Sequence, residues 1–433
     1  MKSDKITIVF DGAIFKVPFY NPTSKTGIFF TALNVFTELA KRDEVRLLVC
    51  CEDDFYVIRD VIQNYFPKQN FEYISLGWLF FDKIKKTRYV MKQQKKYIRR
   101  FGLKLIQMSL KPFVNYMQKK KYKQNIKVIN QSTAYFSTHM AKPKDINITA
   151  YTILYDIIPN IIPNIIPNYR EQASNTKSWF NKLINSLNAD DYYFAISDST
   201  RNDFLQYYPI IDKNHIITTH LACDKSFTQK TSKEINAVKT KYNIPQDKKY
   251  IFSLCTLEPR KNLIRVVNTF LAFIERHNIN DMVLVLGGGH WDEFMREFEK
   301  HIGLLSETQQ SKILKIGYVE DEYLSALYSG AFFFVYTSQY EGFGLPPLEA
   351  MSCGCPVITS NNTSLPEVVG NAGIMIDYDS DEQHIKAYEK YYFDENLRKE
   401  NAKKGIDRAK QFSWTKCVDI MVDTIKKNVK GDS

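Results

Sequence analysis

Short runs of apolar residues, bounded by turn residues, alternate along the chain with segments of helical periodicity. This alternation is typical of parallel sheets covered by helices, whose strands are buried on both faces. In the first half it predicts strands over Ile6–Phe10, Val45–Cys51, Ile126–Asn130, Ile148–Tyr155 and Tyr192–Ser197, with helices over about Ile28–Ala40 and from about Ser199. In the second half it predicts strands over Tyr250–Leu254, Met282–Leu286, Ile313–Tyr318, Phe332–Thr337, Pro356–Ser360 and Gly373–Ile376, with helices over about Asn262–His277, Asp321–Ser329, Leu345–Ser352 and Asp381–Lys410.

The polar stretch Asp224–Asp247, rich in Lys, Thr and Ser, separates these two series of strands. We therefore expect two α/β domains, with a ligand in the cleft between them at the carboxyl ends of the strands. The expected division has a first Rossmann-like domain, a linker, a second Rossmann-like domain and a C-terminal helix, over residues 1–224, 225–247, 248–411 and 412–433.

Several absences in the sequence narrow the class of protein. No run of 18 apolar residues occurs, and the apolar run Ile6–Phe10 near the start is too short for the core of a signal peptide. The seven Cys are odd in number and form no C-x-x-C pair, and the seven His are scattered. The pattern predicts a cytoplasmic protein with reduced thiols and no metal site.

The basic residues are concentrated in one segment, residues 82–127. This segment contains 16 Lys and Arg against a single acid, while the rest of the chain carries 43 bases and 47 acids. The formal net charge of +11 therefore arises in this segment. Bases alternate there with apolar and aromatic side chains at helical spacing, from about Lys83 to Met117. The pattern predicts an amphipathic basic helix, interrupted near Gly102 and Pro112.

Three interpretations of residues 82–127 stay open from the residues alone. A basic amphipathic helix binds anionic membrane surfaces, where each base contributes about 1 kcal/mol. A basic patch also binds nucleic acid, which we do not expect here because no recognised motif is present. The third interpretation is a solvated helix face that covers the first domain, as most charge runs are.

The strongest candidate chemistry lies where a predicted strand turns into a helix, in Glu341-Gly342-Phe343-Gly344-Leu345-Pro346-Pro347-Leu348-Glu349. A Gly-containing turn before a helix presents free N–H groups and the positive end of the helix dipole, which together bind anions. Glu341 precedes the turn, and Glu349 lies about one turn into the helix. Two carboxylates beside an anion site suit a ligand with phosphates and hydroxyls, whereas the alternative is a surface turn with two solvated Glu.

With its surroundings, this stretch closely resembles glycosyltransferase family four. The resemblance extends to four further segments, Gly317-Tyr318-Val319, Ala350–Ile358, Leu365-Pro366-Glu367-Val368 and Thr256–Leu263, and to Ala195–Thr200 in the first half. It implies the GT-B fold, in which two Rossmann-like domains face each other with parallel sheets across a cleft. It also implies a retaining enzyme that uses a nucleotide sugar and needs no metal or other cofactor.

The resemblance implies a role for each matching residue. Arg260 and Lys261 would neutralise the diphosphate and stabilise it as the leaving group, a task that charge-assisted hydrogen bonds suit. Glu349 would bind the ribose hydroxyls, and Glu341 would contact the transferred sugar. Backbone amides would hold sugar and phosphate oxygens, and a glycine of the first domain would approach the diphosphate; these residues are Gly342, Phe343, Gly344, Leu345 and Gly27.

Two positions depart from the family pattern. Cys255 and Thr256 stand where relatives often have Gly or Gly-Arg, so Arg260 would supply the guanidinium contact. Tyr155-Asp156 stands where many relatives have His-Asp, and tyrosine does not normally exchange protons near neutral pH. Asp156 is therefore the candidate for positioning the acceptor, with a loop-capping carboxylate as the alternative.

The sequence thus predicts a hexosyltransferase, with a mannosyltransferase as one candidate, acting on a lipid-linked or surface polysaccharide acceptor of the lipopolysaccharide or capsule type. The first domain would bind the acceptor, the second would bind the donor, and the C-terminal helix would cross back to the first domain. With such an acceptor, residues 82–127 are expected to hold the enzyme peripherally at the inner face of the membrane. The alternatives are a catalytically silent sugar-nucleotide-binding protein and a basic nucleic-acid-binding protein.

Overall fold

Buried runs of β-branched and aromatic residues form the strands of two parallel sheets. The computed structural model describes residues 5–21, 27–77, 79–93, 119–161, 180–256, 258–289 and 292–431. Within these residues the first sheet has the order β3-β2-β1-β4-β5-β6-β7 and the second β10-β9-β8-β11-β12-β13, with every pair parallel. The first sheet consists of β1 (Ile6–Asp11), β2 (Val45–Cys51), β3 (Glu72–Ser75), β4 (Ala134–Ser137), β5 (Ala150–Leu154), β6 (Tyr192–Ala195) and β7 (Ile216–Thr218). The second consists of β8 (Lys249–Leu254), β9 (Met282–Gly287), β10 (Ile313–Gly317), β11 (Phe333–Tyr336), β12 (Val357–Ser360) and β13 (Gly373–Ile376).

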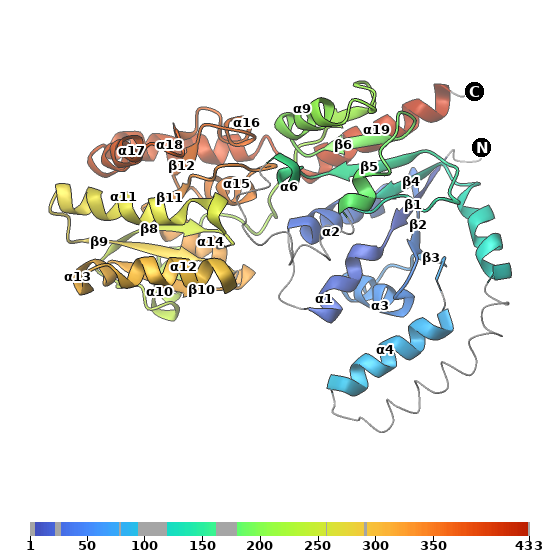
Figure 1. Cartoon of the computed structure of the whole chain (residues 1–433), viewed down its shortest axis with the longest axis horizontal. Helices are drawn as coiled ribbons and strands as arrows, with labels where there is room; N and C mark the ends of the chain where they lie inside the picture. Colours follow the sequence, from blue (N-terminus) through green and yellow to red (C-terminus); the bar gives the residue numbers. More distant parts are fainter. Residues whose placement is uncertain are drawn as a thin grey trace.

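Helices cover both sheets, and the two layered units lie side by side (Figure 1). Those of the first unit are η1 (Ala13–Lys16), α1 (Val17–Tyr20), α2 (Gly27–Ala40), α3 (Phe55–Tyr65), α4 (Leu79–Gln93), α6 (Ile158–Ile161) and α9 (Asp198–Tyr207), with further helical residues 119–129 and 180–184. After them come α10 (Ser232–Lys241), η2 (Pro259–Lys261), α11 (Leu263–Arg276), α12 (Asp292–Gly303), α13 (Glu307–Gln310), α14 (Asp321–Gly330), α15 (Leu345–Ser352), α16 (Leu365–Val369), α17 (Asp381–Phe393), α18 (Glu395–Ala409) and α19 (Trp414–Gly431).

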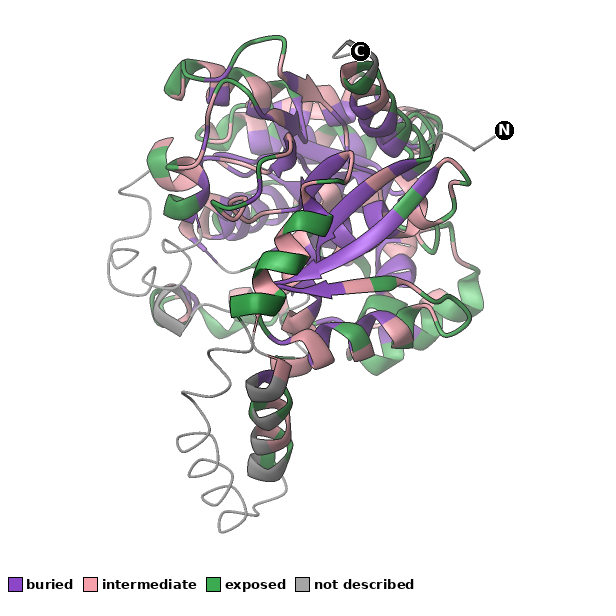
Figure 2. Ribbon diagram, turned by 90° about the vertical axis from the view of Figure 1, so that its right-hand side faces the viewer, coloured by how far each residue is buried: buried purple, intermediate pink, exposed green. Residues whose placement is uncertain are grey.

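The hydrophobic pattern predicted the two parallel sheets correctly because their strands are buried on both faces. Figure 2 shows the strands of the first sheet as buried almost throughout, while the helices expose their outer faces. Phe10 and Phe136 stack on the neighbouring strands β1 and β4 with ring centroids 5.5 Å apart, and Phe136 stacks on Phe194 of β6 at 6.0 Å. Continuous apolar runs of this kind are expected in parallel sheets.

Three local predictions were wrong. Ile126–Asn130 is not a strand: residues 119–129 are helical, and Tyr122, Ile126 and Ile129 pack together at helical spacing. The strand that pairs with β1 in this part of the chain is instead β4 (Ala134–Ser137), which is fully buried. Residues 381–410 form two helices, because the Asp394 side chain accepts the Leu397 N–H at 2.8 Å and begins a new helix. The short strands β3 and β7 were missed.

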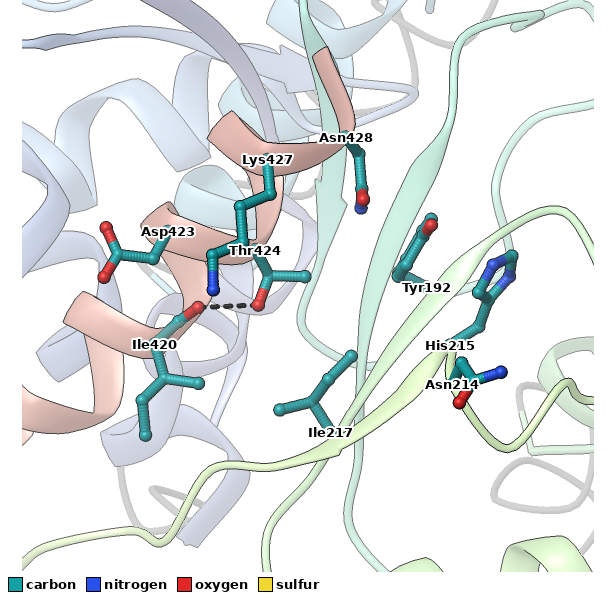
Figure 3. A pocket seen from close by; sticks show the side chains of 9 residues that line it. All are labelled: Tyr192, Asn214, His215, Ile217, Ile420, Asp423, Thr424, Lys427 and Asn428. Atoms are coloured by element: carbon teal, nitrogen blue, oxygen red, sulfur yellow. Dashed lines mark hydrogen bonds between the residues drawn. The ribbon is translucent and has the colours of Figure 1, made fainter. Parts of the chain in front are cut away.

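The end of the chain packs against the first unit, where α19 lies beside α2. Arg42 of the first unit forms an ion pair with Asp419 at 2.7 Å, and Lys426 pairs with Glu44 at 3.3 Å. A pocket of about 460 Å³ lies between α19 and β7 (Figure 3), with Ile217 and Ile420 on facing walls. Its lining residues Tyr192 and His215 lie at the amino ends of β6 and β7, opposite the strand ends at which the candidate site is built.

Part of the basic segment 82–127 lies in α4, which packs against α3. Lys85 forms an ion pair with Asp54 at 2.8 Å, and Lys86 pairs with Asp60. These two bases are therefore neutralised by the first unit itself, as the solvated-face interpretation expects. Residues 94–118 of the segment lie outside the described residues. In the described part of the chain no helix combines the length and apolar character needed to cross a membrane.

Candidate active site

The predicted site residues of the second unit lie where the order of its sheet reverses. Strands β8 and β11 are neighbours, and the chain leaves them in opposite directions along the sheet. After β8 comes the turn η2, which carries Arg260 and Lys261. After β11 comes the loop that holds Glu341 and leads into α15. Parallel sheets bind ligands at such a reversal, because the loops diverge and leave a crevice between them.

Glu341 is the centre of a buried charged cluster at this reversal. Its side chain is about 10 % exposed, which contradicts the alternative of a solvated surface turn. Its Oε1 accepts hydrogen bonds from Lys261 Nζ at 2.6 Å and from Arg260 Nη1 at 2.9 Å. The Tyr336 hydroxyl donates to the same oxygen at 2.9 Å. Two cations and a phenol therefore converge on one carboxylate oxygen.

The charges of this cluster keep Glu341 ionised. Burial by itself would raise the pKa of Glu341, but Arg260 and then Lys261 outweigh it and lower that pKa to about 2. For Arg260, burial favours loss of the proton, while Glu341 and Glu258 oppose it and raise its pKa above the ordinary value. Arg260 Nη2 also donates to Glu258 at 2.8 Å, and Nη1 donates to the Tyr340 carbonyl at 2.7 Å. The guanidinium is thus held in one orientation.

Glu349 lies within α15, and its surroundings differ from those of Glu341. Its Oε2 accepts a hydrogen bond from the hydroxyl of Tyr328 at 3.0 Å. Burial raises the pKa of Glu349 to about 7, and the Tyr328 hydrogen bond offsets this only in part. Glu349 therefore changes charge near neutral pH, whereas Glu341 does not.

The head of α15 supplies few but well-placed amide donors. Pro346 and Pro347 have no N–H, and Leu348 donates to the Gly344 carbonyl at 3.3 Å. The amides of Gly344 and Leu345 are then the donors at the positive end of the helix. Gly344 has φ of 122°, and a Cβ there would lie 2.8 Å from Leu365, so the turn requires glycine. Two amide donors at a helix start suit the oxygens of one phosphate group.

The first unit contacts the loop before α15 through Tyr155 and Asp156. A Cβ added to Gly342 would lie 2.5 Å from the Tyr155 carbonyl oxygen and 3.1 Å from Asp156 Cβ, so only glycine permits this approach. Burial raises the pKa of Asp156, and Arg260 partly offsets the shift. Asp156 Oδ1 also accepts the Ile158 N–H at 3.1 Å. Asp156 therefore both caps its own loop and faces the charged cluster.

The first unit also places Gly27 and the side chain of Tyr155 near the site. Gly27 begins α2, and a Cβ there would lie 3.8 Å from Leu345 Cδ1, so α2 starts directly opposite the head of α15. The Tyr155 hydroxyl is buried beside Thr31 of α2, and burial raises its pKa above the ordinary tyrosine value. It is therefore unsuited to exchanging protons at the site.

The sequence around this site is similar to that of known proteins. The sequence profile described as glycosyl transferases group 1 matches residues 234–408, the part that contains Arg260, Glu341 and Glu349. Residues 234–408 of this chain therefore belong to the glycosyl transferases group 1 family. It is 35% identical over 247 residues to the O-antigen chain mannosyltransferase B of Escherichia coli, and 31% identical over 251 residues to the serotype-specific mannosyltransferase WbdA of the same organism. These matches cover 56% and 57% of this chain but only 62% and 30% of the two relatives.

Two solved structures have the same fold over nearly the whole chain. The Anabaena protein Alr3699/HepE, solved with UDP and glucose, has a TM-score of 0.64 at 12% identity, covering 98% of this chain and 100% of that one. WaaG, a glycosyltransferase involved in lipopolysaccharide biosynthesis, has a TM-score of 0.60 at 14% identity, covering 97% and 99%. The two parallel sheets therefore form a GT-B fold, as the sequence predicted.

The charged residues that the sequence proposed for the site lie together in the structure, but the sequence reasoning missed the residues that orient them. The structure brings Arg260, Lys261 and Glu341 into direct contact and places Asp156 beside them. The missed residues are Tyr336, Glu258, Tyr340 and Tyr328. Tyr336 ends a strand of phenylalanines, and that change to a polar aromatic residue at the strand's carboxyl end was the available signal.

Proposed function

We propose that this protein is a mannosyltransferase that moves a mannosyl group, with retention, from a nucleoside diphosphate sugar to a growing surface polysaccharide. The observation that carries the proposal is the buried contact of Arg260 and Lys261 with Glu341 at the head of α15. The family match and the mannosyltransferase relatives favour mannose over other hexoses. The acceptor type is proposed from the first of these relatives, which is named O-antigen chain mannosyltransferase B.

The proposed roles follow from charge and position. Arg260 and Lys261 stabilise the diphosphate as it departs, since preorganised cations act most strongly where charge develops in a buried site. The amides of Gly342, Phe343, Gly344 and Leu345 bind sugar and phosphate oxygens. Glu341 contacts the sugar.

On the nucleoside side, Glu349 accepts the ribose hydroxyls and Gly27 faces the diphosphate. Asp156 positions the acceptor, and the departing phosphate takes the acceptor's proton. None of these steps requires a metal or cofactor.

The direct test uses a panel of nucleoside diphosphate sugars that carry mannose, glucose or galactose. Release of nucleoside diphosphate is followed with and without a polysaccharide-primer acceptor, and the product linkage is determined by NMR. We expect acceptor-dependent turnover that is fastest with a mannose donor, and a loss of donor affinity of about 10- to 100-fold in Glu349→Ala. Donor binding without any turnover would instead indicate a silent binding protein.

We further propose that residues 82–127 dock the enzyme on an anionic membrane, where a lipid-linked acceptor would lie. The 16 bases of the segment are the reason, although Lys85 and Lys86 are already paired within the first unit. Replacing Lys95, Lys96, Arg99 and Arg100 with Ser should weaken sedimentation with anionic liposomes and leave donor binding intact. Equal sedimentation of both proteins would favour the solvated-face interpretation.

A further inference from the structure

The two domains meet at the amino half of α9, which contacts the loop between β11 and α15 (residues 337–344, here called the donor loop). The Ser197 hydroxyl donates to the Gly342 carbonyl at 2.7 Å, and Thr200 Oγ1 lies 3.1 Å from the same oxygen. The Tyr340 hydroxyl, also from the second domain, donates to Asp203 one turn further along α9. Figure 1 shows α9 and α16 next to each other at this junction.

Glu367 of α16 caps α9 from the opposite domain. Its Oε2 accepts the Asp198 N–H at 2.8 Å, and its Oε1 accepts the Ser199 N–H at 3.1 Å. His220 Nε2 lies 3.1 Å from Oε2. First-turn amides have no intrahelical partner and carry the positive end of the dipole, so a carboxylate there is favourable. The Glu367 side chain is only 19% exposed, which limits screening by solvent.

The segment that carries Glu367 also holds the donor loop. Just before α16, Ser364 Oγ lies 3.0 Å from the Glu341 carbonyl and 2.6 Å from the Phe343 carbonyl. Thr363 Oγ1 accepts the Glu341 N–H at 3.2 Å. On the other side, Arg408 Nε donates to the Val368 carbonyl at 3.1 Å, which fixes α16 to α18. Thr363 and Ser364 therefore connect the start of α16, which carries Glu367, to the backbone of Glu341.

We propose that Glu367 is a positioning residue, an interdomain latch that holds the closed arrangement in which Asp156 faces Glu341 and Arg260. Glu367 itself does not contact the donor. Its kinetic consequence rests on the proposed function, because a donor bound by both domains binds only the closed fraction of molecules. The latch itself rests on the contacts of α9 and α16 alone.

A cation bridge is the competing account of the same residues. Asp198, His220 and Glu367 offer ligand atoms within 4.8 Å of one another. However, both oxygens of Glu367 already accept backbone N–H groups, and Asp198 Oδ1 accepts the Thr218 hydroxyl at 2.5 Å. We therefore assign hydrogen bonds rather than a metal ion to the latch.

The test compares wild-type protein with Glu367→Ala and Glu367→Gln, using Glu382→Ala as the matched control. Glu382 also lies in the first turn of a second-domain helix and pairs with bases, but only within its own domain. Amide hydrogen exchange at Asp198 and Ser199 should accelerate about tenfold or more in Glu367→Ala. The radius of gyration from X-ray scattering should increase, with Glu367→Gln intermediate and Glu382→Ala unchanged.

Kinetics separate a latch from a merely structural residue. We expect donor KM to rise about tenfold in Glu367→Ala with a smaller change in kcat, as a reduced closed fraction requires. Unchanged exchange and scattering in both Glu367 variants would overturn the latch. Opening of the wild-type protein by EDTA would overturn it in favour of a cation bridge. Lack of transfer by the wild-type protein would defeat the proposed function only, since exchange and scattering need no substrate.

Discussion

Glu341 precedes α15 and Glu349 lies within it, and their surroundings shift the pKa of the glutamate side chain in opposite directions. Around Glu341, two bases outweigh the effect of burial and hold the pKa near 2. Around Glu349, burial prevails over a single hydrogen bond from Tyr328 and raises the pKa to about 7. The difference teaches that a motif fixes residue types but not their charge states, which the neighbours decide.

The largest effect is expected from removing a cation on the Glu341 side. Lys261→Met keeps the length of the side chain and leaves Glu341 with Arg260 as its remaining base. We expect kcat to fall at least about 100-fold, because a preorganised charge at the leaving group is lost. The free energy of unfolding should also fall by about 3 kcal/mol, because breaking a buried pair leaves a poorly compensated charge. Nucleoside diphosphate release and chemical denaturation measure the two effects.

Lys315→Met is the matched control for this change. Lys315 pairs with Glu299 at 2.6 Å, but both side chains are exposed, and such pairs contribute about 1 kcal/mol or less. A loss of stability as large as that of Lys261→Met would show that burial of the pair is not what matters. Activity equal to wild type in Lys261→Met would remove Lys261 from the donor site.

On the Glu349 side, the expected effect is a dependence of stability on pH. The folded protein holds the Glu349 proton more tightly than the unfolded chain, whose ordinary value is 4.5. The resulting stabilisation is complete below about pH 4.5 and is lost as the pH rises through about 7. Glu349→Gln cannot ionise, so between pH 5 and 8 it should lose about 1–3 kcal/mol less stability than the wild type.

For Glu341 we expect the opposite dependence of stability on pH, which gives an internal comparison. Because its folded pKa is lowered, its stabilisation is present above about pH 4.5 and is lost as the pH falls toward about 2. Denaturation curves of the wild type and Glu349→Gln should therefore diverge on the alkaline side and run together below about pH 4.5. Parallel curves across the whole range would mean that Glu349 is not buried as the structure describes.

The fold could be predicted from the sequence where strands are buried on both faces, but not where the same apolar residues fit either a helix or a strand. The continuous runs of β1 and β9 permit only a buried strand, so they were found with nearly correct bounds. Ile126 and Ile129 fit either state, and the helix over 119–129 was decided by packing that the local pattern does not contain. The strands β3 and β7 were missed because they are short and only partly buried, whereas the equally short β11 and β12 are buried throughout.

The site was predictable as a set of charges but not as a geometry. Arg260, Lys261 and Glu341 come from loops that are about 80 residues apart in sequence and meet only because β8 and β11 are neighbours. Tyr328 has no distinguishing context in the sequence, since tyrosine is equally suited to the core. The opposite pKa values of the two glutamates follow from those contacts and could not be read from the E-x7-E spacing.

The smallest effect is expected at Gly27, which faces Leu345 between the two glutamates. A Cβ at Gly27 would meet Leu345 only at the ordinary contact distance of 3.8 Å, so Gly27→Ala should leave the fold intact. Its stability should stay within about 0.5 kcal/mol of the wild type, or rise slightly, because alanine favours the helix. Donor KM should nevertheless rise a few-fold, because the methyl group occupies space that a diphosphate would need on the first-domain side. Wild-type KM together with wild-type stability would show that the donor lies nearer to Glu341 and Glu349 than to α2, and would confine the donor site to the second domain.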